Sequence, residues 1–593
     1  MELNPSAIVG IGLIGAVTFY LGFHSSRLAN TTPDFLVARR IVRSRRNAAA
    51  ITGEYLSAAS FLGIAGLILK DGVDTLWYAV GFTAGYLALL LFVAAPLRRS
   101  GAYTLPDFAE ARLGSVGLRR LATVFVVVIS VLYLVPQLQG AGLTLSTVMP
   151  VPAWVGSVVV VVLVAVNAFG GGMRSITVVQ AFQYWVKLVA LALPTFVLIV
   201  VFVGGHPAAS PLSANTSPVF TSQKSIAIPV AVQLQVAEPV RVQAYGVVNG
   251  FRNNGPLLMA PGIFYKVGAN STLVFPAGSP VPTPSDSPDT NAAWLRPQSG
   301  GLSALFSTYS LIVALFLGTM GLPHVLVRFY TNPNGRAARR TTLHVLLLLG
   351  LFYLFPTMLG ALSRLYTPEL LVTGQTDAAI LLLPAKLVGG MGGEVLGAVI
   401  VAGAFAAFLS TSSGLLVSIA GVVSTEAFPG RVRDFRWATL LAALVPLVLA
   451  LSLPQADISL SVGLSFALAA STFCPVLVVG IWWRRLTWVG AAAGMVVGGG
   501  LVLTALVLNI ISEYTGSWAP WPVVQPALIT VPAAFATVII VSLCTQDKVP
   551  PDVSRILLRL HAPDPLGFIR DRDVARFGPA APQSPTDGRH HRG

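Results

Sequence analysis

Long apolar segments separated by short polar ones recur along almost the whole chain. About 20 apolar residues in a helix suffice to cross the hydrocarbon core of a bilayer, at about 1.5 Å per residue. The pattern predicts an all-α polytopic membrane protein whose transmembrane domain covers residues 1–545. The thirteen predicted spans are 5–23, 48–69, 75–96, 120–146, 153–169, 177–203, 303–327, 341–363, 392–424, 437–453, 458–482, 488–511 and 524–545.

Composition supports a membrane protein and excludes a soluble one. Of the 593 residues, 54% are hydrophobic and 10% are charged, and the mean hydropathy is +0.76. The net charge of +15 does not indicate a nucleic-acid partner, because the basic residues lie in short clusters between apolar segments. These clusters occupy alternate connections, which predicts an N-terminus outside the cell membrane and a cytoplasmic C-terminus.

Two segments are too polar to cross a membrane. The predicted extracellular loop 204–301 is rich in Pro, Ser, Thr and Asn, and we expect a linker there. Its stretch 226–236 alternates between apolar and polar residues, so a small β-hairpin or lid is the alternative. The tail 546–593 has little apolar content, and we expect it to be cytoplasmic and largely disordered, with the disorder beginning beyond about Phe577.

The second span contains the run from Gly53 to Gly63, GEYLSAASFLG, with a carboxylate, two serines and several small residues. Such a run suits a discontinuous helix whose freed carbonyls face a cavity. A tightly packed interface between small residues is an equal alternative.

The seventh span ends in Gly318-Thr319-Met320-Gly321-Leu322-Pro323-His324. Two glycines and a proline predict a second helix break, because proline removes a backbone hydrogen bond and clashes with the preceding turn. The two breaks lie five spans apart, as expected of two inverted five-helix repeats. His324 suits either a proton carrier or, more often, a simple hydrogen-bonding group.

The ninth span carries hydroxyl groups where a membrane helix is usually apolar. No charged residue lies in the 31 positions between Glu394 and Glu426, yet the sequence Ser410-Thr411-Ser412-Ser413 lies in the middle. Ala407, Ser410 and Thr411 share one helix face. Their hydroxyls either bond back to the preceding turn or help to bind a small hard cation. We assign Ser412 and Ser413 to helix packing.

Other chemistry finds little support in the sequence. No metal-ligand spacing, nucleophile elbow or phosphate-binding loop is present, so we do not expect an enzyme. Lys187 in the sixth span is expected to snorkel or to pair with a neighbour rather than to act on a solute.

Four motifs together are familiar. They are Gly53–Gly63, Tyr103–Phe108 (YTLPDF), Leu317–His324 followed by Arg328-Phe329-Tyr330, and Ile481–Ala491 (IWWRRLTWVGA). In these motifs the chain resembles the sodium:solute symporter family, and within it the cation–acetate and monocarboxylate symporters. The similarity covers residues 1–545 apart from the long loop.

The resemblance implies a LeuT-type core, a 5+5 inverted repeat of spans 2–6 and 7–11, with one extra N-terminal helix. It also implies a sodium site between the first core helix and the eighth. By position, the coupling ion Na⁺ would be held by carbonyls of Gly53, Leu56 and Ala407 and by hydroxyls of Ser410 and Thr411.

The function implied is sodium-coupled symport of a small carboxylate solute, of the acetate, propionate or pyruvate class, by alternating access. The alternatives keep the fold but use a proton or carry another solute such as proline; a membrane receptor or sensor is a third. The solute is expected to contact residues at the two breaks, namely Ser57, Ala59, Ser60, Gly318, Thr319, Gly321 and His324.

Overall fold

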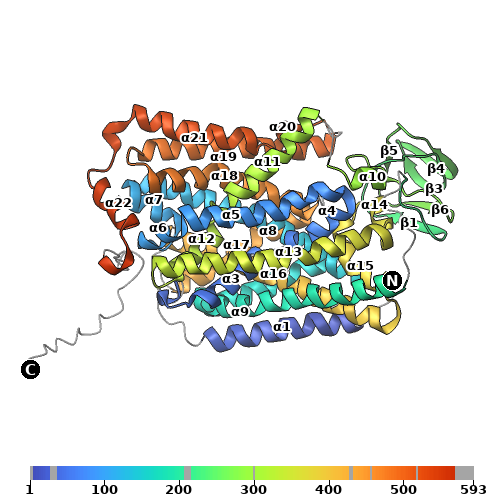
Figure 1. Cartoon of the computed structure of the whole chain (residues 1–593), viewed down its shortest axis with the longest axis horizontal. Helices are drawn as coiled ribbons and strands as arrows, with labels where there is room; N and C mark the ends of the chain where they lie inside the picture. The colour runs from blue at the N-terminus through green and yellow to red at the C-terminus, as the bar shows by residue number, and fades with distance from the viewer. Residues whose placement is uncertain are drawn as a thin grey trace, which may run out of the picture.

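The structure is a computed structural model of the chain, and the apolar segments form an elongated helical bundle (Figure 1). It describes residues 5–26, 37–205, 216–297, 301–426, 432–453, 457–515 and 518–567. The predicted disorder beyond Phe577 lies outside the described residues.

The long helices run along the long axis of the bundle (Figure 1). The helices are α1 (Pro5–Ser26), α3 (Ser44–Tyr55), α4 (Ile64–Asp71), α5 (Leu76–Phe92), α6 (Ala94–Arg99), α7 (Leu105–Leu113), α8 (Val116–Val148), α9 (Ala153–Gly205), α10 (Asn291–Trp294), α11 (Gly301–Thr319), α12 (Pro323–Val327), α13 (Gly335–Tyr366), α14 (Glu369–Thr373), α15 (Ala379–Leu387), α16 (Gly390–Glu426), α17 (Val432–Ser452), α18 (Ile458–Trp482), α19 (Trp488–Thr515), α20 (Trp521–Val524), α21 (Ala527–Cys544) and α22 (Val553–His561). Shorter helical turns are η1 (Ala38–Arg40), η2 (Ala59–Gly63), η3 (Gly72–Thr75), η4 (Arg328–Thr331), η5 (Thr376–Ala378), η6 (Gln546–Lys548) and η7 (Asp564–Leu566).

The structure confirms a multi-pass membrane protein. Among the described residues, 10 helical segments are long and apolar enough to cross a membrane, and two more apolar helices, Ala153–Ala168 and Trp437–Ser452, are shorter. All of the predicted spans fall on helical segments, although the second and third contribute to a single apolar stretch, Ala59–Phe92. The count of thirteen and the orientation of the termini remain predictions.

Both predicted helix breaks are present. The first separates α3 from the π-helical turn η2, because Leu56 leaves the helical conformation with ψ at 84°. The second separates α11 from α12, where Leu322 is extended and Pro323 begins the new helix. Proline suits the first turn of a helix, since the backbone donor it lacks would be unpaired there anyway.

The 204–301 segment is not a linker, so that expectation was wrong. Its described part forms an antiparallel sheet in the order β1-β6-β3-β5-β2-β7, with β4 paired to β3. The alternation along 226–236 is buried on one side, with Ile226, Ile228, Leu234 and Val236 inside. The strands are β1 (Lys224–Ile228), β2 (Val232–Gln235), β3 (Val240–Val248), β4 (Phe251–Met259), β5 (Tyr265–Val267), β6 (Ser271–Phe275) and β7 (Thr283–Pro284).

The sheet is fixed to one end of the bundle (Figure 1). Lys70 at the end of α4 bonds Asp286 of the sheet segment at 2.8 Å and Asp457, just before α18, at 3.2 Å. The indole of Trp294 donates to the carbonyl of Ile68 at 2.6 Å. Polar contacts of this kind hold the sheet against α4 in one position.

The first part of the tail, residues 546–567, is ordered, and the disorder predicted beyond Phe577 is not tested by it. Helix α22 lies at the opposite end of the bundle from the sheet (Figure 1). Arg559 donates to the carbonyl of Ser100 at 2.7 Å, and Arg99 forms an ion pair with Asp564 at 2.8 Å. Leu560, on α22 itself, is the buried residue of that helix. The tail therefore covers the end of α6, to which one hydrogen bond and one ion pair fix it.

We predict that Asp564→Asn loosens this tail. Burial raises the pKa of the Asp564 carboxyl, but hydrogen bonds from Arg99 and from backbone N–H groups outweigh that effect, so the pKa lies below its usual value. The carboxylate therefore stabilises docking above its ordinary pKa of about 3.9, and this contribution is lost as the pH falls through the lowered value. Limited trypsin cleavage after Arg555 should be several-fold faster in the variant at pH 7.

The control for this experiment is Asp547→Asn, which removes an exposed carboxylate outside the docked contact. Equal cleavage rates in the two variants would contradict a docking role for Asp564.

Candidate ion and solute site at two broken helices

The break after α3 exposes backbone oxygens in the middle of the bundle. Because α3 ends at Tyr55, the carbonyls of Gly53 and Leu56 are released from helical hydrogen bonding. The side chain of Gln137 in α8 accepts from the backbone N–H of Ala58 at 2.9 Å and so fixes the next segment. The break is thus an ordered feature with two buried carbonyls on one side.

The hydroxyls of α16 meet this break. The Ser410 hydroxyl donates to the carbonyl of Gly53 at 2.8 Å and also lies 3.0 Å from the carbonyl of Ala407. The Thr411 hydroxyl donates to the carbonyl of Glu54 at 2.6 Å. The predicted ion-site residues are therefore brought together, but Thr411 bonds a carbonyl outside the predicted set. Ser413, in contrast, bonds back to Leu409, as expected of a packing residue.

A lysine lies at the centre of this group. The amino group of Lys187, from α9, donates to the carbonyls of Gly53 and Leu56 and to the Ser410 hydroxyl, the last two at 2.7 and 2.6 Å. Its side chain is fully buried. Lys187 does pair with neighbours, as expected, but the sequence interpretation did not place it in the ion site.

Because of Lys187, the predicted oxygen set does not fit a sodium ion in this conformation. An ammonium group has three N–H donors, and here they are directed at three of the five predicted sodium ligands. A sodium ion bound by the same oxygens would lie against a second positive charge. We therefore derive no transport step through sodium at this position.

An ion pair buried beside the site joins the two broken helices. Arg328, at the end of α12, donates through Nε to the Glu54 carboxylate at 2.6 Å, and both side chains are almost completely buried. The same guanidinium donates to Thr177 at 2.9 Å and to the side chain of Gln180. Each guanidinium nitrogen of Arg328 thus has a partner, which a buried charge needs because desolvating it alone is costly.

Polar groups of the predicted solute site lie between the two breaks. The Ser60 hydroxyl is 3.0 Å from that of Tyr353, and the Tyr55 hydroxyl is 2.9 Å from that of Thr319. Tyr133 of α8 packs edge-on against Phe466, with ring centroids 6.0 Å apart. Tyrosines from α3, α8 and α13 thus complete a site for which the sequence predicted only serines and threonines.

His324 is one of several buried polar side chains that lack a hydrogen-bond partner in the described part of the chain. It is fully buried, and its ring centroid lies 5.2 Å from that of Tyr133. Neither ring nitrogen has a hydrogen-bond partner among the residues that the structure describes. The ring therefore packs against α8 beside the second break, with both nitrogens left for a bound solute or water to bond.

The two glycines of the second break have a packing role. A Cβ atom on Gly318 would lie 2.5 Å from the carbonyl oxygen of Phe466, and one on Gly321 would lie 2.3 Å from that of Ala469. Glycine at both positions therefore allows α11 to approach the backbone of α18 closely. These contacts do not bring either glycine to Ser57 or Ser60.

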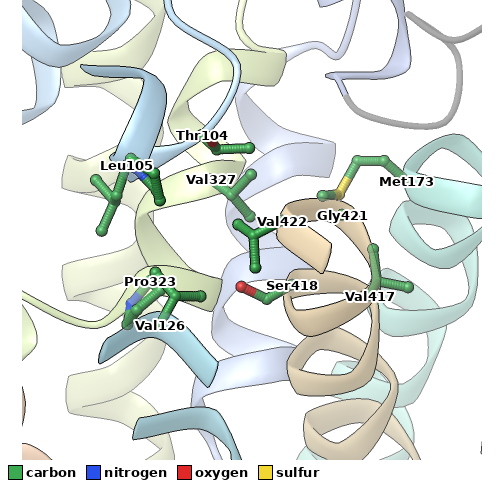
Figure 2. Close-up of a pocket in the computed structure, with 11 residues that line it drawn as sticks. Thr104, Leu105, Val126, Met173, Pro323, Val327, Val417, Ser418, Gly421 and Val422 are labelled. Atoms are coloured by element: carbon green, nitrogen blue, oxygen red, sulfur yellow. The ribbon is translucent and has the colours of Figure 1, made fainter. Parts of the chain in front are cut away.

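A mainly apolar pocket lies next to His324, on the side of Ser410 toward Glu426. Figure 2 shows Val126 and Pro323 on one side of it and Val417, Ser418 and Val422 of α16 on the other. Pro323 precedes His324 in the chain, so the pocket extends the polar region toward the end of the bundle that carries α22. Thr104, Leu105, Pro106, Met173, Val327 and Gly421 complete its lining.

Comparisons with known proteins place this arrangement in a family. The family model for the sodium:solute symporter family matches residues 35–241 and 254–498, which is most of the chain. The chain belongs to the sodium:solute symporter family. Membership confirms the resemblance of the motifs, and it supports sodium-coupled symport rather than an enzymatic activity.

Individual relatives match this symporter over most of the length of both chains. An uncharacterized symporter of Bacillus subtilis is 28% identical over 92% of this chain and 96% of its own. A protein named monocarboxylic acid transporter, from Corynebacterium glutamicum, is 29% identical over 90% of each chain. An uncharacterized symporter of Cupriavidus necator is 30% identical over 87% of this chain and 88% of its own.

The fold of the symporter is also seen in a solved structure. A Na⁺-coupled sialic acid symporter in a substrate-bound outward-open state superposes with a TM-score of 0.57 at 13% identity, covering 91% of this chain and 98% of that one. At this identity the likeness shows the fold alone, and that fold is the LeuT-like one that the family resemblance implied.

Proposed function

We propose that this symporter is a secondary active transporter of a small monocarboxylate, of the acetate, propionate or pyruvate class, working by alternating access. The supporting observation is the buried polar region between the two broken helices, where the hydroxyls of Tyr55 in α3 and Thr319 in α11 lie 2.9 Å apart. The name and near full-length similarity of the Corynebacterium glutamicum relative favour a monocarboxylate as the solute.

The chemistry of this region suits a short carboxylate. Helix N-termini such as that of η2 attract negative charge, because their first N–H groups are unpaired and the helix dipole is positive there. Ser57, Ala59 and Ser60 lie at this N-terminus. The hydroxyls of Ser57 and Tyr133 and the ring of His324 add hydrogen-bonding groups without a fixed charge.

The apolar part of the solute would face aromatic rings. Tyr55 packs edge-on against Tyr86 with ring centroids 4.8 Å apart, and against Phe466 at 6.1 Å. Solute sites commonly combine such apolar walls with a few polar groups that fix orientation. A methyl or ethyl group next to a carboxylate matches this combination.

Counterflow of labelled acetate into proteoliposomes tests the proposal. We expect uptake that unlabelled acetate, propionate and pyruvate inhibit and that proline does not. Uptake driven by an imposed sodium gradient, compared with an imposed pH gradient, identifies the coupling ion. Inhibition by proline alone, or absence of acetate counterflow in protein that is folded, would contradict the monocarboxylate assignment.

A further inference from the structure

The position of Lys187 carries an inference about the coupling site itself. Lys187 lies in the Met173–Gly205 segment of α9, far from either end, and its side chain is fully buried. A charged side chain at this depth is costly, so its partners indicate what it does. Those partners are the carbonyls of Gly53 and Leu56 and the hydroxyl of Ser410.

The three partners are oxygens that a small cation would use. Two are carbonyls released by the break after α3, and the third is a hydroxyl of α16. Hard cations and ammonium groups both bind uncharged oxygens of this kind. The ammonium of Lys187 therefore makes the contacts that the family resemblance assigns to sodium.

The neighbouring charges leave Lys187 dependent on these oxygens. The closest carboxylate in the same part of the bundle, that of Glu54, is held by Arg328 at 2.6 Å. Gln180 bonds both Arg328 and the carbonyl of Ser410, but its side chain is a neutral amide and adds no negative charge. The group of three oxygens thus holds one positive charge, and all three accept hydrogen bonds from Lys187.

We propose that Lys187 is the resident cation of this site and replaces the sodium ion that the family resemblance implies between Gly53, Leu56, Ala407, Ser410 and Thr411. The ammonium group links α9, the broken α3 and α16 in the way that a bound ion would link α3 and α16. Sodium that drives transport is then bound elsewhere or not at all. The inference rests on the proposed transporter function only in calling the site a coupling site.

The test compares sodium-specific stabilisation in purified protein without any solute. Unfolding temperatures are measured in sodium chloride and in choline chloride at equal ionic strength. Removing the ammonium with Lys187→Met frees three oxygens, so this variant should gain a sodium-dependent rise that exceeds that of the wild type by roughly 2 °C or more. Adding Ser410→Ala to Lys187→Met should remove the gain.

Matched variants make the result specific. Lys386→Met removes a partly exposed lysine of α15 that pairs with Glu369, and it should show the wild-type sodium response. Lys187→Gln, which keeps a long polar side chain, serves if Lys187→Met does not fold. Thr411→Ala in the wild-type background removes a predicted sodium ligand that does not contact Lys187.

The outcomes separate cleanly. A larger sodium response in Lys187→Met or Lys187→Gln supports the proposal, as does a wild-type response that Thr411→Ala leaves unchanged. A wild-type response that Thr411→Ala abolishes would overturn it, as would Lys187 variants that fold and respond no more than the wild type. Because no solute is present, failure of acetate counterflow would reject the solute assignment and leave this test intact.

Discussion

Replacing Arg328 by Met is expected to destabilise the protein more than any other single change considered for this site. The substitution leaves the Glu54 carboxylate, whose side chain is 1% exposed, without its ion-pair partner. Breaking a buried pair on one side costs about 3–5 kcal/mol, because the remaining charge stays desolvated. The unfolding temperature in detergent should fall markedly, and solute uptake should be lost with it.

Two companion variants decide whether the pairing is the cause. Arg340→Met removes an exposed arginine of the neighbouring α13 and should change stability by no more than about 0.5 kcal/mol. The double variant Glu54→Gln with Arg328→Met removes both charges, and it should be more stable than Arg328→Met alone. If Arg328→Met unfolds at the same temperature as Arg340→Met, the ion pair does not stabilise the fold.

Gly414→Ala should disturb the same pair from the other side. A Cβ atom on Gly414 in α16 would lie 1.8 Å from the Glu54 carboxylate oxygen and 2.2 Å from its carboxyl carbon. Glu54 cannot move freely, since Arg328 holds it, so the extra methyl group must shift the pair or the helix. Overpacking of this kind costs about 1–3 kcal/mol, which a thermal unfolding series in detergent can measure.

The matched control lies in the same helix. A Cβ atom on Gly397 would have its nearest neighbour, the carbonyl oxygen of Leu381, at 3.8 Å, an ordinary contact. Gly397→Ala should therefore be neutral or stabilising by up to about 1 kcal/mol, because alanine favours a helix more than glycine does. Equal effects of the two substitutions would show that Gly414 is not needed for close approach.

Hydrophobic patterning and proline predicted the helices and both breaks. A long apolar segment in a bilayer has few alternatives to a helix, because every backbone group must be hydrogen-bonded internally. Pro323 directly marked the second break. The four motifs were also sufficient to predict the family.

The sheet was harder to predict, although local signals were present. Asn249 and Gly250 join β3 to β4, with positive φ values of 52° and 83°, as a two-residue hairpin turn requires. That dipeptide, between alternating apolar residues, was a stronger signal than the abundance of Pro and Ser around it. Strand order, in contrast, depends on distant pairings such as β1 with β6, which no local pattern encodes.

At the site, too, local features were predicted from the sequence and contacts between distant segments were not. Ser410 and Thr411 were found from their spacing on one helix, because residues that share an element have a fixed geometry. Lys187 and Tyr133 reach the site from other helices, so their contacts depend on how α9 and α8 pack against the two broken helices. A lone lysine within an apolar span was a signal, but the sequence did not reveal which oxygens it would meet.

The two ion pairs of Lys70 have a consequence for how the antiparallel sheet moves. Lys70 ends α4, the half-helix that follows the first break, whereas Asp457 precedes α18 and Asp286 belongs to the sheet. Tilting of α4 relative to α18 must stretch the contact with Asp457, while the contact with Asp286 and the bond from Trp294 to Ile68 carry the sheet along with α4. An antibody fragment that clamps the sheet to α18 would consequently immobilise α4 as well, which makes the sheet a handle outside the helical bundle for trapping one stage of the transport cycle.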